Sequence, residues 1–573
     1  MPSSGTSFNL MDRPWIPVTM LSDGSHRELS IIETFEQAGD IRSIDGDMPL
    51  QRFALSRLLV AMLYGRFGHD LDVDDWKSLY DYGAGNPSLM QAILEYCDEW
   101  RYRFDLFDDR YPFYQVAGLH TAKHETSGLE RLILDVPSGE PFFTTRMGDG
   151  LQSIRAAEAA RWLVTVQAYD ASGIKSGAVG DPRVKGGKGY PIGVAWTGHL
   201  GGYLVEGTNL WQTLMLNYVS QDVFESGEAA SVQWDDDKPV WEREPLTQQA
   251  TKGFDQPVER TGDTSFFHGP ATLMTWQGRR MLLVHDDETV TGVLVCNGDR
   301  LKPQNAQHHE PMTAWRRSPT QEKALKRPVV YMPRKHDPSR ALWRGLPLLL
   351  ATHDSGNPTG GDDFIRPYSL KWLSKACPER SIPVRLHAFG VEYGNNDAVI
   401  DATVDDTLDI SLVVLTTDNP QMGQMIQDAV DKTDQGIRAL RNLAANIALS
   451  EGKPTEAPQQ RAAELGYSAF DGAFRQWLRG IDHDDNPETL SRDWYSQARQ
   501  LLQRLGSHLA GQASPKAIVG RDVNVNGTTQ HYSAALAEIW FRSRVNGIFN
   551  QTATERANHR DSANQSDNDG TNA

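Results

Sequence analysis

Apolar residues recur every three or four positions over four long stretches in the last third of the chain. These stretches cover residues 422–447, 462–478, 490–509 and 532–549. This spacing places the apolar side chains on one face of a helix, so each stretch predicts an amphipathic helix. The connections between the stretches contain Pro or Gly, which interrupt helices. Four such helices in succession predict a four-helix bundle.

The earlier part of the chain mixes helical and extended patterns. Helices are predicted at residues 50–64, 87–99 and 151–168, and extended runs at residues 15–20, 271–276, 280–285 and 290–296. A hairpin is predicted farther along the chain. Its first strand alternates over residues 385–393, a Gly-Asn-Asn-Asp turn follows at residues 394–397, and the second strand returns over residues 398–404.

These patterns predict an α+β fold. A chain of 573 residues is too long for a single core. Residues 1–410 are predicted to form a large mixed N-terminal domain with irregular loops and hairpins, and residues 411–550 the four-helix bundle. The tail, residues 551–573, is polar and holds no large apolar side chain, so we expect it to be disordered.

The segment of residues 173–202 differs from the rest because ten of its thirty residues are Gly. Glycine permits positive φ angles and close approach of the backbone, so that several N–H groups can converge on an anion. A single acid, Asp181, accompanies four cations: Lys175, Arg183, Lys185 and Lys188. The pattern predicts binding of a phosphate, from a nucleotide or a nucleic-acid backbone. A flexible surface loop with solvated lysines is the alternative that these residues leave open.

A second basic segment covers residues 315–335, where seven Lys and Arg residues accompany only Glu322. Trp315 and Tyr331 lie within it, and this mixture suits neutralisation of a nucleic-acid backbone combined with stacking on bases. The equally open alternative is a solvated face that pairs with acidic segments nearby.

Two polar clusters contain metal-ligating residue types, but structural roles are expected for both. Asp72, Asp74 and Asp75 precede a helical pattern, where carboxylates commonly cap the first turn. The run His308-His309-Glu310 lies in a polar stretch and is expected to be exposed to solvent. We therefore predict no catalytic residue, no metal ligand and no cofactor.

Composition narrows the possible functions further. A net charge of −18 argues against a protein that coats nucleic acid, so such a role requires local basic patches. The three Cys residues form no CxxC pair, which argues against a structural zinc ribbon. No signal peptide and no run of eighteen apolar residues is visible, so a cytoplasmic location away from membranes is expected. The familiar nucleotide-binding and hydrolase motifs are missing, which favours binding over catalysis.

The opening run FNLMDRPWIPV, residues 8–18, and the order of the predicted parts resemble one family over residues 8–550. It is the CasA (Cse-one) family, the large subunit of the type I-E CRISPR Cascade complex. The resemblance implies a non-catalytic subunit at one end of a guide-RNA surveillance complex. Such a subunit recognises the protospacer-adjacent motif of duplex DNA from the minor groove, helps to open the duplex and recruits a helicase–nuclease for antiviral defence. Its implied partners are the other Cascade subunits, the guide RNA, duplex target DNA and the helicase–nuclease.

Two loops of this sequence resemble DNA-contacting loops of that family. The run FFTTRMGDG, residues 142–150, resembles the first loop, and its implied motif-proximal tip is Phe143, Thr144 and Thr145. The run SGIKSG resembles the glycine loop. There the resemblance implies that Gly173, Ile174 and Lys175 lie against the minor groove, with Lys175 meeting a phosphate.

The run EYGNNDA, residues 392–398, resembles the hairpin that acts as a wedge beside the first unpaired base. The implied wedge residues are Asn395, Asn396, Asp397 and Ala398. Asp397 stands where the family typically has Gln, and phosphates repel a carboxylate, so the wedge would act by sterics or through the two Asn residues. Lys302 is the candidate for the family's lysine finger. The Cys-rich zinc ribbon of some members is missing here.

Two other functions stay open from the residues alone. The chain would be a nucleotide- or phosphate-binding enzyme if the Gly-rich segment held its substrate. It would be a scaffold without DNA contact if the helix bundle only docked partner proteins.

Overall fold

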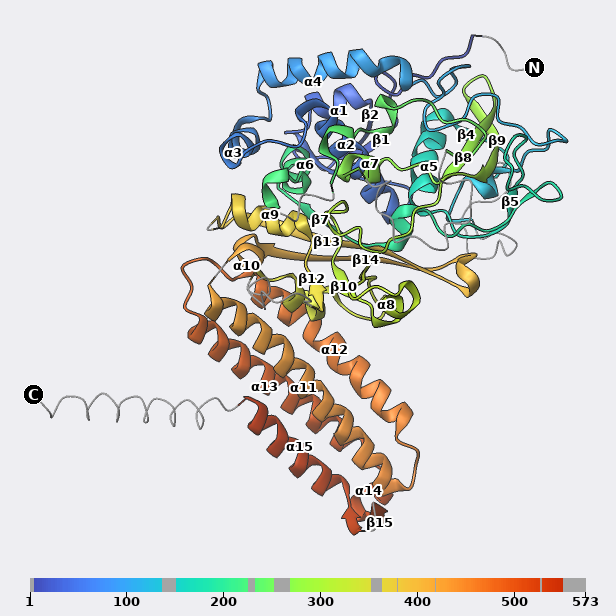
Figure 1. Cartoon of the computed structure of the whole chain (residues 1–573). Coiled ribbons are helices and arrows are strands. Elements are labelled where there is room, and N and C mark those ends of the chain that lie inside the picture. Colours follow the sequence, from blue (N-terminus) through green and yellow to red (C-terminus); the bar gives the residue numbers. More distant parts are fainter. Residues whose placement is uncertain are drawn as a thin grey trace, which may run out of the picture. The chain divides into compact units, whose positions relative to one another are not determined.

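The structure, a computed structural model, describes residues 5–136, 151–224, 232–251, 268–351, 363–378, 380–417, 419–525 and 528–549. The chain divides into two compact units, Met1–Asp418 and Asn419–Ala573 (Figure 1). The first unit mixes helices and sheets and the second is mainly helical, so the chain has the mixed helix and sheet content of an α+β protein.

The first unit begins with a three-stranded antiparallel sheet of order β2-β1-β3 and a group of helices. The helix α2 is buried over most of its circumference, which makes it the centre of this unit (Figure 1). The side chain of Asp72 accepts hydrogen bonds from the N–H groups of Asp74 and Asp75, which confirms the predicted cap. The element bounds are β1 Ile16–Met20, β2 His26–Leu29, α1 Ile31–Glu36, β3 Ile41–Ile44, α2 Pro49–Phe67, α3 Val73–Tyr82 and α4 Pro87–Trp100.

A second sheet has the order β4-β9-β5-β6, with β8 paired to β9. The antiparallel pair of β8 and β9 confirms two of the predicted extended runs. The Gly-rich segment joins this sheet through the two-residue strands β5 and β6. The bounds are β4 Ile154–Arg155, α5 Ala156–Tyr169, β5 Lys175–Ser176, β6 Lys188–Gly189, β8 Arg279–Asp286 and β9 Thr289–Asn297.

The third sheet, of order β14-β13-β7, contains the predicted hairpin, whose long strands stand out in Figure 1. It packs on α2, where the rings of Phe53 and Phe389 stack with centroids 5.2 Å apart. A Cβ at Gly202 would lie 2.6 Å from the Phe53 ring, so this contact requires glycine. The bounds are β7 Gly201–Glu206, β13 Pro383–Tyr393 and β14 Ile400–Ser411.

The remaining elements of the first unit are short. A small sheet has the order β11-β10-β12. The bounds are α6 Leu210–Asn217, α7 Pro270–Met274, β10 Trp315–Arg317, α8 Pro319–Leu325, β11 Tyr331–Pro333, β12 Phe364–Ile365, α9 Tyr368–Ala376 and α10 Val413–Thr416.

Two predictions for this unit are wrong. The run 271–276 forms helix α7 and not a strand, because the distant Asp237 carboxylate accepts from the N–H groups of Ala271 and Thr272 at 2.9 and 2.7 Å. His309 and Glu310 are fully buried and not exposed. Glu310 accepts two hydrogen bonds from the buried Arg57 guanidinium, at 2.7 and 2.8 Å, so a salt bridge between distant segments holds it inside.

In the second unit, α11 packs against α12, α13 and α15. Trp494 lies at the centre, with its ring against Phe470, Phe474 and Trp477. The short helix α14 and the hairpin β15–β16 precede α15, and the sequence analysis missed them. No helix within the described residues is long and apolar enough to cross a membrane. The bounds are α11 Pro420–Glu451, α12 Glu456–Arg479, α13 Pro487–Gly511, α14 Pro515–Val519, β15 Arg521–Val525, β16 Thr528–Tyr532 and α15 Ala534–Phe549.

Candidate nucleic-acid interface

Two of the segments singled out from the sequence meet in the first unit. The backbone N–H of Ser172, which precedes the glycine loop, donates a hydrogen bond of 2.7 Å to the carbonyl of Asp397 at the hairpin tip. The start of the glycine loop and the tip therefore lie side by side, although they are far apart in the sequence. Phe143, Thr144 and Thr145, the third predicted segment, lie outside the described residues.

The hairpin tip is a compact, exposed turn. Asn395, Asn396, Asp397 and Ala398 are all exposed, and backbone hydrogen bonds from Asp397 to Gly394 and from Gly394 to Val399 close the turn. Asn396 and Asp397 have φ angles of 57° and 56°. Asn and Asp adopt this left-handed conformation more readily than other residues with a side chain, which explains why they occupy these two positions.

Tyr393 anchors the base of the tip. Its hydroxyl donates a hydrogen bond of 2.6 Å to the carbonyl of Tyr169 at the end of α5. Its ring lies against Gly198, where an added Cβ would come within 2.2 Å of the hydroxyl oxygen. The absence of a side chain at Gly198 thus lets the Tyr393 hydroxyl pass close to the backbone of residues 196–199 and reach the end of α5.

Lys335 is a residue near the tip that the sequence analysis did not select as a site residue. Its ammonium lies 5.2 Å from the centre of the Tyr393 ring. Burial lowers the pKa of Lys335, and the nearby charges of Asp397 and Glu392 act in the opposite direction. A cation therefore lies over the Tyr393 ring at the base of the tip, where the negative charges of Asp397 and Glu392 act on it. The signal for it was the basic segment 315–335, of which Lys335 is the last residue.

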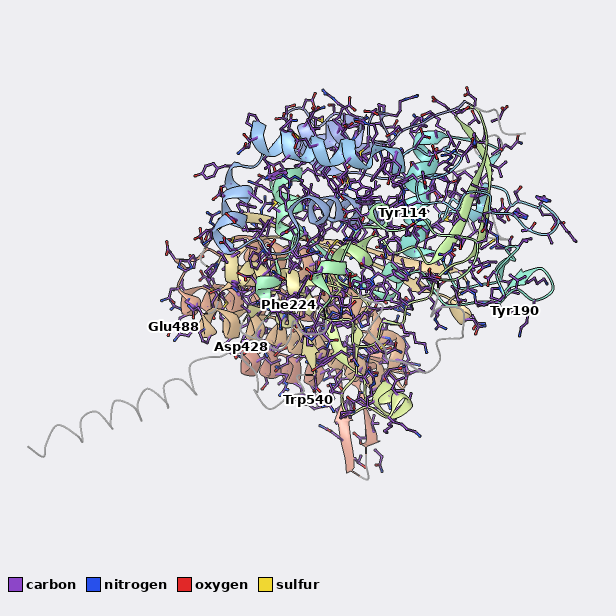
Figure 2. All side chains as sticks on the ribbon, turned by 45° about the horizontal axis from the view of Figure 1, so that its top comes forward. Tyr114, Tyr190, Phe224, Asp428, Glu488 and Trp540 are labelled. Carbon is purple, nitrogen blue, oxygen red and sulfur yellow. The ribbon has the colours of Figure 1, made fainter. Side chains whose placement is uncertain are left out.

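The glycine loop is open to solvent at Gly173 and Ile174. A Cβ at Gly173 would meet no atom within 4 Å, and Ile174 is 51% exposed. Farther along the same segment, Lys185, Lys188 and Tyr190 are exposed, and Tyr190 projects at the edge of the unit in Figure 2. This combination of open backbone, cations and an aromatic ring suits contact with a nucleic acid.

Lys175 does not project from this loop. Its side chain is only 7% exposed, and its ammonium contacts the carboxylate of Asp170 at 2.7 Å. Asp170 also accepts a hydrogen bond from the buried guanidinium of Arg279. Burial on its own would raise the pKa of Asp170, but the positive charges of Arg279 and Lys175 outweigh it and lower the pKa. Burial lowers the pKa of Lys175, and this effect outweighs the negative charge of Asp170, which on its own would raise the pKa. This triad of Asp170, Lys175 and Arg279 fixes the start of the glycine loop from inside.

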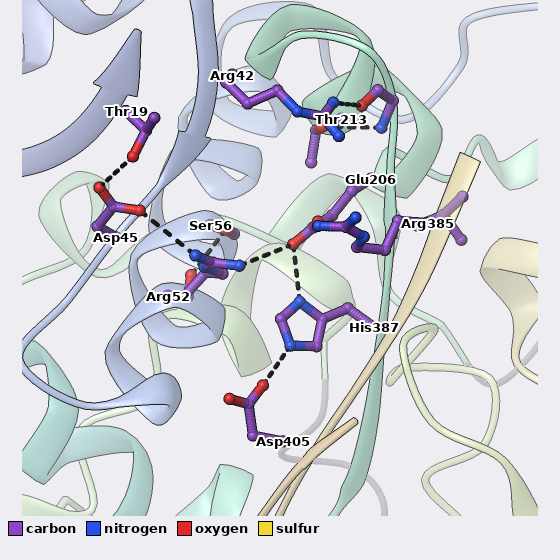
Figure 3. Close-up of polar contacts among 12 residues, drawn as sticks. Thr19, Arg42, Asp45, Arg52, Ser56, Glu206, Thr213, Arg385, His387 and Asp405 are labelled. Atoms are coloured by element: carbon purple, nitrogen blue, oxygen red, sulfur yellow. Dashed lines mark hydrogen bonds and ion pairs between the residues drawn. The ribbon is translucent and has the colours of Figure 1, made fainter. Parts of the chain in front are cut away.

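A second buried network lies along the strands that lead to the tip (Figure 3). The two ring nitrogens of His387 lie 2.9 Å from a carboxylate oxygen of Glu206 and 2.5 Å from one of Asp405. Arg52 of α2 lies between Glu206, at 3.6 Å, and Asp45, at 3.4 Å. Burial on its own would lower the pKa of His387, but the hydrogen bonds that its ring donates to the Asp405 and Glu206 carboxylates outweigh burial and raise the pKa. The His387 ring therefore ties β13 to both neighbouring strands.

The other basic positions have mixed surroundings. Lys302 is half-buried in the irregular stretch after β9. In the basic segment 315–335, Trp315 is buried and Arg317 pairs with Glu322, the acid of the same segment, at 2.6 Å. Within the described residues, no group of three or more His, Cys, Asp or Glu side chains is placed to hold a metal ion.

Comparison with known proteins agrees with this fold. Residues 9–505 match the family described as CRISPR-associated protein Cse1. The crystal structure of Thermobifida fusca Cse1 is 40% identical, with a TM-score of 0.83, and the match covers 95% of this chain and 98% of that one. The CasA/Cse1 protein of Thermus thermophilus is 29% identical over 314 residues, so the match spans 54% of this chain and about half, 55%, of that protein.

A chain of a solved CRISPR RNA-guided surveillance complex shares the fold, at 17% identity, with a TM-score of 0.68 and coverage of 94% of this chain and 99% of that one. Together, the fold and these matches define a CRISPR-associated protein of mixed helix and sheet structure. The chain belongs to the Cse1 (CasA) family.

Proposed function

We propose that this chain is the large, non-catalytic subunit of a CRISPR RNA-guided surveillance complex in the cytoplasm. It recognises the protospacer-adjacent motif of duplex DNA from the minor groove, helps to open the duplex and recruits a helicase–nuclease for antiviral defence. Membership of the Cse1 family supports the assignment to such a complex. The packing of α11, α12, α13 and α15 supports a four-helix bundle in the second unit, available to partner subunits.

The observation that carries the DNA-binding proposal is the hydrogen bond between Ser172 and Asp397. It joins an exposed backbone loop to a rigid, exposed tip. The backbone at Gly173, which carries no side chain, can approach base edges in a narrow groove, and a tip beside it can displace a base pair. The proposed DNA contacts are Phe143, Thr144, Thr145, Gly173, Ile174, Lys302 and the tip residues Asn395, Asn396, Asp397 and Ala398, with Lys335 partly neutralising Asp397.

The environment of Lys175 weighs against the alternative of a nucleotide-binding enzyme. A phosphate-binding loop relies on a lysine that is free to reach the ligand. Here the ammonium is buried and committed to Asp170. Lys175 therefore acts as an internal support of the glycine loop and does not itself contact a phosphate.

The test uses the guide-RNA complex reconstituted with and without this chain, and target duplexes that differ only in the flanking trinucleotide. We expect the chain to create a preference among flanks. Gly173→Asp should remove this preference because it places a carboxylate against the DNA, while the open space at Gly173 leaves the fold intact.

Gly472→Asp is the matched control. Gly472 is exposed in α12, and a Cβ there also meets no atom within 4 Å. This variant should keep the preference among flanks. Equal binding of all flanks by the complete complex, or equal behaviour of the two Asp variants, would contradict the proposed DNA site.

A further inference from the structure

A cavity of about 310 Å³ opens in the first unit between two irregular segments, residues 103–117 and 240–248, with Gln277 beside them. It shares no lining residue with the glycine loop or the hairpin tip. Its volume is at the lower end of the range typical of small-molecule sites. The proposed DNA recognition makes no use of it, so it requires a separate explanation.

The charge around this cavity is positive. Arg103 and Arg110 line it, and none of its fifteen lining residues is Asp or Glu, although the protein carries a net charge of −18. Neither arginine forms an ion pair with a carboxylate in the part of the chain that the structure describes. Arg103 donates to the carbonyl of Arg243 at 3.0 Å, and the nearby Asp108 carboxylate accepts backbone hydrogen bonds from Arg110 and Tyr111. Two guanidinium groups are thus available to an anion.

Two largely buried residues with polar side chains, Tyr114 and Gln277, also line the cavity. Tyr114 is 6% exposed and Gln277 is 7% exposed. Among the described residues, neither the Tyr114 hydroxyl nor the Gln277 side-chain amide has a hydrogen-bond partner. Both polar groups belong to residues that line the cavity, so a molecule bound there can reach them. Tyr114 also has a φ angle of 57°, a conformation that bulky residues rarely adopt.

The walls of the cavity are aromatic. Tyr111, Phe113, Tyr114 and Trp241 line it, and the Arg103 guanidinium lies 5.6 Å from the centre of the Tyr111 ring. Figure 2 places Tyr114 within the body of the first unit. Aromatic rings suit a planar ring system, an amide and a hydroxyl suit the polar edge of a base, and guanidinium groups suit a phosphate.

We propose that this cavity is a binding site for a single nucleotide unit, an aromatic base with its phosphate. The base lies among the aromatic rings and is recognised by Tyr114 and Gln277, and the phosphate lies near Arg103 and Arg110. The unit comes either from a free nucleoside monophosphate or from the end of a single strand. The site is independent of the proposed motif recognition.

The test titrates the full chain with AMP, GMP, CMP and UMP, and separately with a short single-stranded oligonucleotide. Isothermal calorimetry and quenching of tryptophan fluorescence report the binding, because Trp241 lines the cavity. We expect at least one monophosphate to bind with a Kd below about 1 mM. Arg103→Gln or Arg110→Gln should weaken binding about tenfold or more, and the conservative Tyr114→Phe should weaken it several-fold.

Arg27→Gln is the matched control, because Arg27 is exposed and lies outside the cavity. Saturable binding of a monophosphate that the cavity variants weaken identifies a free nucleotide as the ligand. Binding of the oligonucleotide alone, with the same sensitivity, identifies the end of a strand. Absence of binding of either probe, or equal weakening by Arg27→Gln, overturns the proposal.

Discussion

The triad of Asp170, Lys175 and Arg279 offers the sharpest test of how the glycine loop is held. Asp170→Asn keeps the shape of the side chain but leaves two cations, 7% and 1% exposed, facing a neutral amide. Breaking a buried ion pair from one side costs about 3–5 kcal/mol. In a unit of this size, each kcal/mol lowers the melting temperature by about 2 °C or less, so we expect a decrease of roughly 5–10 °C.

The matched variant Lys175→Met removes one cation and leaves Asp170 paired with Arg279, so it should destabilise less. In the double variant only Arg279 is unpaired, and its loss of stability should be smaller than the sum of the two single losses. Calorimetric melting of the four proteins measures this coupling. Additive effects, or a change below about 1 kcal/mol for Asp170→Asn, would refute the ionic triad.

The pH dependence of this effect has a definite sign. Because the folded pKa of Asp170 is lowered, its contribution to stability is present at neutral pH and is lost as the pH falls through that folded value. The melting temperatures of the native chain and of Asp170→Asn should therefore converge in acid.

DNA binding by the complex tests whether Lys175 faces inward. If it does, Lys175→Met should leave the salt dependence of DNA binding unchanged. A slope reduced by about one unit would show that Lys175 contacts a phosphate after all.

Two further predictions concern the hairpin. The raised pKa of His387 means that its stabilising contribution is complete below the ordinary value of 6.5 and is lost as the pH rises through the folded value. Urea unfolding from about pH 6 to about pH 9 should show this loss in the native chain but not in His387→Gln, and parallel curves would contradict it. Gly198→Ala should cost about 1–3 kcal/mol, because the new Cβ would displace Tyr393, and it should weaken the preference among flanks. Gly472→Ala serves as the control, and equal melting temperatures of the two Ala variants would contradict this contact.

The local sequence pattern predicted much of the secondary structure. It did not predict elements whose terminal backbone N–H groups donate hydrogen bonds to residues that are distant in the sequence. Helix α7 was mistaken for a strand because Asp237, the carboxylate that caps it, lies more than thirty residues earlier in the chain. Glu310 was expected at the surface because its own neighbourhood is polar. Its partner, Arg57, belongs to α2, and no local signal connects the two.

At the candidate site, too, the sequence predicted some features and tertiary packing decided others. The resemblance selected Gly173 and the residues around Asp397, and these segments lie together in the structure. Charge alone suggested that Lys175 would meet an anion, yet tertiary packing buries it against Asp170. Lys335 escaped selection because seven cations share its segment and only the fold places one of them beside Tyr393.

The sequence by itself determined most of the helical and extended segments, that the chain needs more than one core, and where glycine is concentrated. These properties depend on neighbours within a few positions, because apolar spacing and turn residues act locally. Only the tertiary structure decided which cations are internally paired and which lie near the tip. It alone joined Ser172 to Asp397, and it alone enclosed the cavity beside Tyr114. Such features depend on residues that are distant in the sequence and become neighbours only when the whole unit folds.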